Sequence, residues 1–294
     1  MTTGDSPAGA RRRLRLALRK AREATGRTQG QVADALDWSI SKVNRIESGD
    51  VTISSTDLDA LLRLLDVRDP EQVGRLAEEA RTSRRRGWWD QPRFRENLSP
   101  ATQQLIQFEM EASAIRVFQF ANFPGLLQTR EYARSIIGTV GDDMSEEGRS
   151  ARLEARMLRQ ENLRSRLNPP QYIVILDELL LLRTIGSQTI MVEQLKLLVE
   201  AAGKPENLIR LLPKEESSFL LMGAFNVYDI GAEENAILYR EGSVTDELLE
   251  NADTVHRFRL RFEQMWNLCL SEDASARAIE AHYASARAFL DRER

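Results

Sequence analysis

The 294-residue sequence has only one cysteine and two histidines, the side chains that most often form disulfides and bind zinc. The lone Cys269 excludes a disulfide within the chain and is typical of proteins from a reducing compartment. His256 and Cys269 fall within one expected helix, where their separation of thirteen residues puts the side chains about 20 Å apart. This separation excludes a Cys–His dyad within that helix and an ordinary Cys/His zinc site, so we expect both residues to have packing roles.

Long apolar runs and the short motifs of common enzymes are also missing. No segment approaches the roughly eighteen continuous apolar residues that a membrane span needs. The polar Met1–Ala10 and the basic Arg11–Arg13 lead into an amphipathic segment, whereas a secretory signal would continue with an uninterrupted apolar region. The sequence has no glycine-rich phosphate loop, no G-x-S-x-G and no H-E-x-x-H. We therefore expect a cytoplasmic protein without membrane contact, catalytic activity, metal or cofactor.

The net charge of −4 is distributed unevenly along the chain. Residues 1–95 contain 19 Lys and Arg against 14 Asp and Glu, a net charge of +5. The remaining residues contain 22 against 31, a net charge of −9. Because phosphate groups attract basic residues, this asymmetry favours nucleic-acid binding by the first part of the chain alone, although charge also varies along chains that bind no nucleic acid. The chain also exceeds the usual single-domain length, and we expect two domains.

Residues 11–80 have the spacing of closely packed short helices, and we expect them to form an all-α helix-turn-helix bundle. Leu14 and Leu18 recur at helical spacing, and Gly26 follows as a stop signal. Residues that favour helix ends then recur beside each apolar stripe. The expected caps are Thr28 with Gln31, Ser39 with Gly49, and Ser54 with Asp57.

We expect a linker at residues 81–95 and an α+β domain at residues 96–294. Together with the all-α first domain, this makes the whole protein mainly α. The helical patterns cover residues 101–116, 146–167, 189–201, 246–270 and 274–290. The runs with the composition of strands are 116–120, 172–176, 208–212, 225–230 and 236–239. We expect these short runs to form a small, mostly antiparallel sheet in a domain that supplies dimer contacts; its role in sensing and partner binding is implied only by the family resemblance given below.

Residues 28–49, TQGQVADALDWSISKVNRIESG, have the pattern of two short helices that cross steeply. A small residue is needed where the helices touch, and Ala33 is placed there. Val43 and Ile46 are spaced three apart and can anchor the second helix from beneath. The turn usually contains a left-handed glycine; Asp37 occupies it here, and aspartate is among the few other residues that accept this conformation. The second helix is then free to enter the major groove of DNA.

The outward side of this second helix, residues 39–48, supplies the candidate contacts with double-stranded DNA. Asn44 suits adenine and Arg45 suits guanine, because their paired hydrogen-bonding groups match those base edges. Lys42 points sideways toward phosphate, and Gln29 begins the preceding helix, where a side chain and backbone amides can hold a phosphate together. The predicted contact residues are Thr28, Gln29, Ser39, Ile40, Ser41, Lys42, Asn44 and Arg45. Such domains bind paired half-sites about one helical turn apart, so we expect a homodimer.

The basic and aromatic residues around this segment leave other interpretations open. The two helices could form an αα-hairpin of some helical protein, but the seven Lys and Arg in residues 11–22 favour DNA. Trp88 and Trp89 follow Arg84–Arg86 and could stack on bases, as aromatic residues do in single-strand binders. Such a pair more often anchors a linker on a neighbouring core, and we favour that interpretation.

Two patterns in the second part of the chain are equally open. The loop at residues 123–129 places two leucines after a turn, and it could shape a pocket, a partner groove or a buried connection. Asp177 and Glu178 follow a strand-like run and could pair with a cation or cap the next helix. We do not assign catalysis to them.

Both parts of the chain resemble bacterial regulators. Residues 13–66 resemble the helix-turn-helix domain of the phage-repressor-like, or xenobiotic-response-element (XRE), regulators through TQ-x-x-VA-x-x-L and S-x-S-K-V-x-R-IE-x-G. Residues 88–275 resemble a sensor-like domain in regulators of filamentous high-GC bacteria. The similar segments are Trp88-Trp89, FEMEASAIRVFQF (108–120), FPGLLQTREYAR (123–134), ARMLRQENL (155–163), ILDELLLLR (175–183), AFNVYDI and AILYRE. The resemblance implies an antitoxin-like transcription regulator with a very small protein partner or a small-molecule effector. In the alternative that it implies, the chain neutralises this partner, and DNA binding serves autoregulation.

Overall fold

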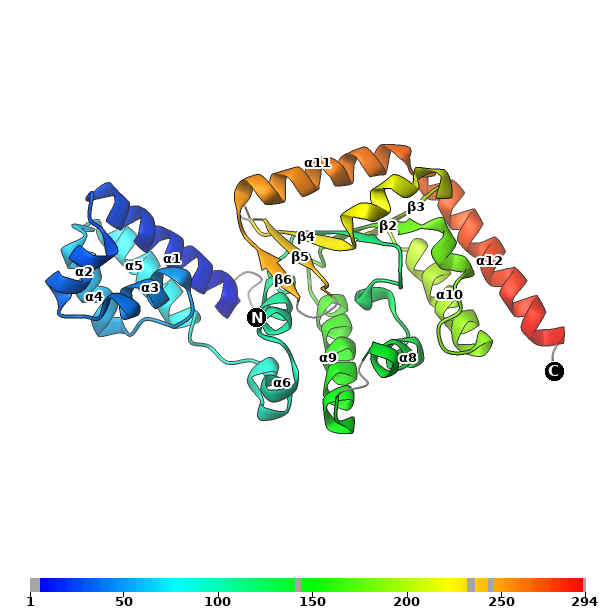
Figure 1. Ribbon diagram of the computed structural model, residues 1–294, viewed down its shortest axis with the longest axis horizontal. Coiled ribbons are helices and arrows are strands. Elements are labelled where there is room, and N and C mark those ends of the chain that lie inside the picture. The colour runs from blue at the N-terminus through cyan, green and yellow to red at the C-terminus, as the bar shows by residue number, and fades with distance from the viewer. Residues whose placement is uncertain (1–5, 141–143, 232–235, 243–245, 293–294) are drawn as a thin grey trace. The chain divides into compact units, whose positions relative to one another are not determined.

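The computed structural model describes residues 6–140, 144–231, 236–242 and 246–292. The chain separates into two compact units, Met1–Trp88 and Trp89–Arg294 (Figure 1). The polar start of the chain at Met1–Asp5 lies outside the described residues. In the described part of the chain, no helix is long and apolar enough to cross a membrane.

The first unit is built of helices throughout its described residues, as the sequence predicts. These helices are α1 (Pro7–Ala24), α2 (Gln29–Leu36), α3 (Ile40–Ser48), α4 (Ser55–Leu64) and α5 (Pro70–Thr82). The hydroxyl of Ser6 accepts a hydrogen bond from the backbone N–H of Gly9, so α1 begins before the first leucine of its stripe. The expected caps Thr28, Ser39 and Ser54 each accept a backbone hydrogen bond three residues on, which confirms these helix starts.

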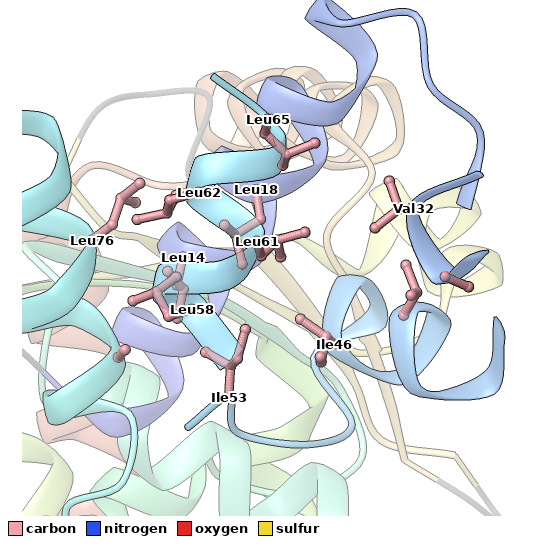
Figure 2. Packing of buried hydrophobic residues seen from close by; sticks show 13 residues of the cluster. Leu14, Leu18, Val32, Ile46, Ile53, Leu58, Leu61, Leu62, Leu65 and Leu76 are labelled. Carbon is pink, nitrogen blue, oxygen red and sulfur yellow. The ribbon is translucent and has the colours of Figure 1, made fainter. Parts of the chain in front are cut away.

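The core of this unit consists of aliphatic side chains from all of its helices (Figure 2). Leu18 of α1, Val32 of α2 and Leu58 of α4 are at most 1% exposed. Burying one such side chain stabilises the fold by about 1.5–3 kcal/mol. In Figure 2, Val32 of α2 and Ile46 of α3 lie on the right of the cluster. The leucines of α1 and α4 gather to their left: Leu14, Leu18, Leu58, Leu61 and Leu62. The cluster therefore fixes α2 and α3 on a scaffold made by the other helices.

The second unit combines a six-stranded sheet with helices on both of its faces. Its helices are α6 (Pro92–Asn97), α7 (Pro100–Glu109), α8 (Arg130–Val140), α9 (Glu146–Arg164), α10 (Gln188–Ala202), α11 (Ala252–Leu268) and α12 (Glu272–Arg292). Its strands are β1 (Ala114–Gln119), β2 (Gln171–Asp177), β3 (Asn207–Leu212), β4 (Phe225–Asp229), β5 (Ile237–Arg240) and β6 (Glu247–Leu249). Short 3-10 segments are η1 (Trp88–Asp90), η2 (Gly125–Leu127), η3 (Glu178–Leu182) and η4 (Lys214–Met222). The mainly α composition agrees with the sequence.

The sheet is mixed, so the prediction of a mostly antiparallel sheet is wrong. The strand order is β3-β2-β1-β4-β5-β6. β1 pairs with β2 and β2 with β3 in parallel, while β1 with β4, β4 with β5 and β5 with β6 are antiparallel. The reason is that α9 lies between β1 and β2, and α10 lies between β2 and β3. A helix between two strands carries the chain back to the end of the sheet where the first strand began, so the next strand runs parallel to the first.

The two faces of the sheet are covered by different helices. α11 lies along one face, where Phe118, Phe225 and Phe262 are buried with ring centroids 5.9 to 6.4 Å apart. α8, α9 and α10 lie on the opposite side of the sheet (Figure 1). Ile115 of β1 and Tyr172 of β2 are register partners and line a pocket together with residues of α9 and α10. The second face is therefore the one that holds a pocket.

Two expected helix boundaries are also corrected by strand pairing. Residues 110–116 were expected to continue a helix, but α7 ends at Glu109 and β1 follows. The backbone N–H of Ser113 donates to Asp229 O, which brings this segment beside β4. Residues 246–251 were expected to start the long helix, yet β6 pairs with β5 and α11 begins at Ala252. Both errors arise because non-local pairing overrides a local helical pattern.

Candidate nucleic-acid interface

The helix-turn-helix segment is shaped by local hydrogen bonds at each of its turns. Thr28 Oγ1 accepts from the backbone N–H of Gln31, and Gln31 Oε1 accepts from the N–H of Thr28, which completes the expected capping box. Asp37 ends α2 in the left-handed region with φ 55° and ψ 43°, as expected from the sequence. The N–H of Trp38 then donates to Ala33 O, and Ser39 caps α3 through the N–H of Lys42. These bonds set the direction in which α3 leaves the turn.

α3 is anchored on one side and exposed on the other. Ala33, Val43 and Ile46 are at most 5% exposed and belong to the core cluster, which confirms the buried positions expected for the contact residue Ala33 and the anchors Val43 and Ile46. The predicted base-reading residues lie on the opposite side of this helix and are exposed: Ile40, Ser41, Asn44 and Arg45. Ile40 is 61% exposed, which is unusual for a large apolar side chain and leaves it available for contact. The outer face of α3 is therefore accessible to a groove.

The end of α3 is fixed by a three-residue network. Arg22 of α1 donates from Nε and Nη2 to the two carboxylate oxygens of Glu47, at 2.6 and 3.1 Å. The Nε2 of Gln29 donates to the same carboxylate at 2.9 Å. Glu47 raises the pKa of the Arg22 guanidinium, mainly through this hydrogen bond. The side chains of Arg22 and Glu47 are 11% and 7% exposed, so the network joins α1, α2 and α3 inside the unit.

Gly49 completes this end of the helix. It adopts a φ of 84°, as expected for a residue just past a helix end. A Cβ at this position would lie 2.8 Å from Arg15 Cδ, so a larger residue would have to displace the arginine side chain as well as adopt a backbone conformation that favours glycine. Glycine therefore lets the chain leave α3 close to α1 without such a shift.

Lys42 makes contacts within the unit. Its Nζ donates to Asp57 Oδ1 at 2.8 Å and lies 3.9 Å from the ring centroid of Trp38. The Lys42 ammonium lowers the pKa of the Asp57 carboxyl, and this hydrogen bond is the largest cause. The Lys42 side chain is still 36% exposed. Its ammonium thus links α3 to α4 and keeps one side open to solvent.

The structure separates the predicted contact residues into two groups. Ile40, Ser41, Asn44 and Arg45 share the exposed side of α3. Thr28 and Gln29 lie at the start of α2, where the first backbone amides have no partners within the helix. Ser39 caps the start of α3, and Lys42 lies in the first turn of that helix.

The basic run of α1 is partly engaged within the unit. Arg13 donates to both carboxylate oxygens of Glu79 at 2.8 and 3.0 Å, and Arg19 pairs with Glu23 at 2.9 Å. Arg22 binds Glu47. These side chains have structural partners, so this run contributes less free charge to a DNA surface than its composition indicates.

Sequence reasoning missed the residues that position α3 from behind. Glu47 and Asp57 hold Gln29, Arg22 and Lys42, yet Glu47 was assigned no role and Asp57 only a capping role with Ser54 at the start of α4. Glu47 lies 25 residues from Arg22, and no local pattern relates the two. The only available signal was the acidic residue in the R-IE-x-G part of the motif.

Three other sequence candidates take structural roles. Trp89 is 5% exposed, which agrees with anchoring better than with base stacking. Asp177 accepts from the backbone N–H of Leu179 and Glu178 from that of Lys214, so both act as caps. Burial raises the pKa of the Cys269 thiol to about 12, which keeps it protonated and unreactive near neutral pH.

Family comparisons match most of the chain. Residues 13–76 match the model described as a helix-turn-helix domain. Residues 102–281 match the model described as a domain of unknown function (DUF5753). Neither a curated protein nor a solved structure matches the chain. The order of a helix-turn-helix domain followed by a second family domain agrees with the coarser part of the resemblance to bacterial regulators.

Proposed function

Because the chain belongs to the DUF5753 domain family and also contains a helix-turn-helix domain, we propose that it is a cytoplasmic, sequence-specific DNA-binding transcription regulator that reads the major groove with α3. One observation carries the proposal: Ser41, Asn44 and Arg45 are exposed on α3 while the inner side of this helix is anchored in the core. A helix held in this way can enter a groove without losing its own packing. The proposal assigns the chain no catalytic reaction.

The exposed residues of α3 differ in the base edges that they suit. Arg45 can donate two hydrogen bonds to guanine, and Asn44 can exchange two with adenine. Ser41 can bond to either base, and the apolar Ile40 suits the methyl group of thymine. We assign base reading to these four residues.

Phosphate contacts are assigned to the ends of the two helices. The backbone amides of Gln29 and Gly30, which the capping box does not use, can hold one phosphate together with Thr28 at the start of α2. Ser39 and the half-exposed Lys42 can approach another from the first turn of α3. Gln29 also has a positioning role, since its side-chain amide already donates to Glu47. Such contacts fix the register of the protein on the duplex and carry no sequence information themselves.

We further propose that the regulator is an XRE-type homodimer. Domains of this kind read two half-sites about 34–36 Å apart, which is one helical turn of DNA. The net negative charge of the second unit disfavours contact with phosphate, so this unit would remain off the DNA. It would then be available to supply the dimer contacts.

The decisive experiment is selection of bound fragments from random double-stranded DNA with the full chain. A regulator of this kind enriches one motif with two-fold symmetry and half-sites about one turn apart. Enrichment of an asymmetric single site would contradict the dimer. Recovery of no motif, or an affinity that does not fall as salt rises, would contradict sequence-specific DNA binding, because phosphate contacts release counterions.

The antitoxin-like alternative is a proposal about the second unit. It is supported by the resemblance to antitoxin-like regulators and by the excess of 31 acidic over 22 basic residues after residue 95. Co-expression with a small protein encoded beside the gene in the native host tests it. A stable complex isolated by size-exclusion chromatography supports neutralisation, whereas elution of the chain as a homomer alone would argue against a tight partner.

A further inference from the structure

A pocket of about 220 Å³ opens in the second unit between α9, α10 and η2. Its floor is the sheet, where the register partners Ile115 and Tyr172 lie side by side. Its other apolar lining residues include Leu126, Leu127, Leu163, Leu197 and Ala201. The pocket therefore lies between layers of this unit and is lined mainly by apolar side chains, as ligand sites are.

The turn η2, which forms one wall of the pocket, is held by buried glutamines. Gln160 of α9 donates from Nε2 to the carbonyl oxygens of Gly125 and Gln128, at 2.8 and 2.9 Å. Gln194 of α10 donates to Leu127 O at 2.6 Å. Gln128, Gln160 and Gln194 are 2%, 5% and 0% exposed, respectively. Buried amides that are bonded in this way resist rearrangement, so the wall is preformed before any ligand arrives.

The size of the pocket limits its ligand. An apolar cavity of about 150 Å³ accommodates benzene, so 220 Å³ accommodates an apolar body of roughly nine or ten non-hydrogen atoms. A phenyl or branched aliphatic group lies within this limit and fits the space lined by Leu126 and Leu163. The polar groups of a sugar or a nucleotide base would find no partner where they lie against these leucines, so the apolar part of the wall disfavours both.

A second cavity behind the pocket is too small and too polar for the apolar body. Leu126 and Tyr172 line both spaces, and the inner one has about 20 Å³, room for about one water molecule. Its lining includes the buried ion pair of Arg159 with Glu109. The apolar body of a ligand is therefore confined to the outer pocket. A polar head group attached to this body would lie at the mouth of the pocket, which we call the rim.

The rim carries charged groups of both signs. Arg164 of α9 and Lys204 after α10 supply two cations, while Glu200 and Glu206 supply two carboxylates. Among the residues that the structure describes, these four form no ion pair with one another. Arg164 instead donates to Gln160 Oε1 at 3.2 Å. A head group with one ammonium and one carboxylate would find an oppositely charged partner for each charge.

From these features we propose that the pocket binds a small zwitterionic molecule with an apolar body, for which an apolar α-amino acid is the simplest chemistry. The body lies on Ile115 and Tyr172 beneath η2, and the head meets the charged rim. This site is separate from the helix-turn-helix surface, and its occupation needs no DNA.

Isothermal titration calorimetry of the full chain without DNA tests the proposal. The probes are L-phenylalanine, 3-phenylpropionate, which lacks the ammonium, and phenethylamine, which lacks the carboxylate. We expect saturable one-to-one binding of phenylalanine, at least tenfold tighter than that of either truncated probe. Equal or tighter binding of a truncated probe overturns the zwitterionic head, and no binding of any probe overturns the site.

Matched variants locate the binding. Leu163→Trp places a larger ring into the pocket from α9, and we expect at least a tenfold loss of phenylalanine affinity. Leu167→Trp makes the same change at a side chain that is 89% exposed and outside the pocket lining, so affinity should be retained. Leu126→Ala, which removes apolar contact without filling space, should weaken binding several-fold. Retained affinity in both Leu163→Trp and Leu126→Ala would place the probe elsewhere.

Rim variants test the head group. Lys204→Ala should weaken phenylalanine binding and leave phenethylamine binding unchanged, because only the carboxylate loses a partner. Lys196→Ala on α10 is the control, since Lys196 is exposed and does not line the pocket. Equal effects of the two lysine variants would contradict a specific role for the rim.

Discussion

In the helix-turn-helix unit, the base-reading candidates of α3 face outward, while Glu47 and Lys42 of the same helix form ion pairs with α1 and α4. In the second unit, an Arg–Glu pair and three glutamines lie inside the fold. The first arrangement leaves hydrogen-bonding groups available to a partner. The second uses them to fix a turn and a cavity. Buried polar networks are costly to break, whereas exposed ones are cheap to change, and this difference ranks the following predictions.

The largest effect is expected from Arg159→Leu. Arg159 donates to Glu109 at 2.6 and 2.8 Å, and the Glu109 side chain is 3% exposed. Removing the arginine leaves a buried carboxylate without its partner, which should lower the free energy of unfolding by about 3–5 kcal/mol. Urea unfolding followed by circular dichroism measures this. The double variant with Glu109→Leu should recover much of the loss; a double variant no more stable than the single one would refute the pair as the cause.

Glu47→Ala should have the next largest effect and should affect both stability and DNA binding. It leaves the Arg22 guanidinium, 11% exposed, without its carboxylate, and we expect a loss of roughly 2–3 kcal/mol. Because α3 loses its ion pair with α1, affinity for the selected operator should fall as well. Glu23→Ala removes an exposed neighbour of the same arginine and is the control. If the two variants unfold at the same urea concentration, the network does not hold α3.

Arg45→Ala should leave stability nearly unchanged, since this side chain is exposed. We expect it to cost about 1–3 kcal/mol of operator affinity and to relax specificity at one base pair. Fluorescence anisotropy with the operator and its single-base variants measures both effects. Arg68→Ala removes an arginine that is 87% exposed and outside the motif, so it should bind like the unaltered chain. Unchanged discrimination in Arg45→Ala would exclude base reading by this residue.

The smallest effect is expected from Asp57→Asn. Lys42 holds the pKa of Asp57 below its ordinary value of 3.8, so the pair stabilises the fold fully above that pH. The contribution is lost as the pH falls through the lowered pKa of the folded protein. With both side chains about one third exposed, solvent screening limits it to less than about 1 kcal/mol near neutral pH. Thermal unfolding at pH 7 and in strong acid, with Asp59→Asn as control, should show a difference only at the higher pH.

What the sequence could predict was mostly local. Three predicted features depend only on a few neighbouring residues, and the structure has all of them. They are the capping box of Thr28, the left-handed Asp37 and Gly49 at the C-terminal end of α3. The inward Val43 and outward Asn44 follow from helical periodicity alone. Local rules therefore specified the shape of the candidate interface.

What depended on distant residues was beyond the sequence. The partners Arg22 and Glu47 come together only when α1 and α3 pack. The strand order places β1 between β2 and β4, which no periodicity in any single strand indicates. The sequence left three interpretations of the loop at 123–129 open. In the structure, Leu126 and Leu127 of this loop line a pocket. A hydrophobic pattern tells which side of an element is buried and leaves open which element covers it.

α3 is held at both ends, by the Ser39 cap at its start and by Glu47 near its end. As the proposed reading helix, α3 would lose little conformational entropy on docking, because both of its ends are already fixed in the folded domain. Differences in operator affinity should then appear in how long the complex lasts more than in how quickly it forms. The heat capacity change on binding should likewise reflect the surface that α3 covers, with no added contribution from coupled folding.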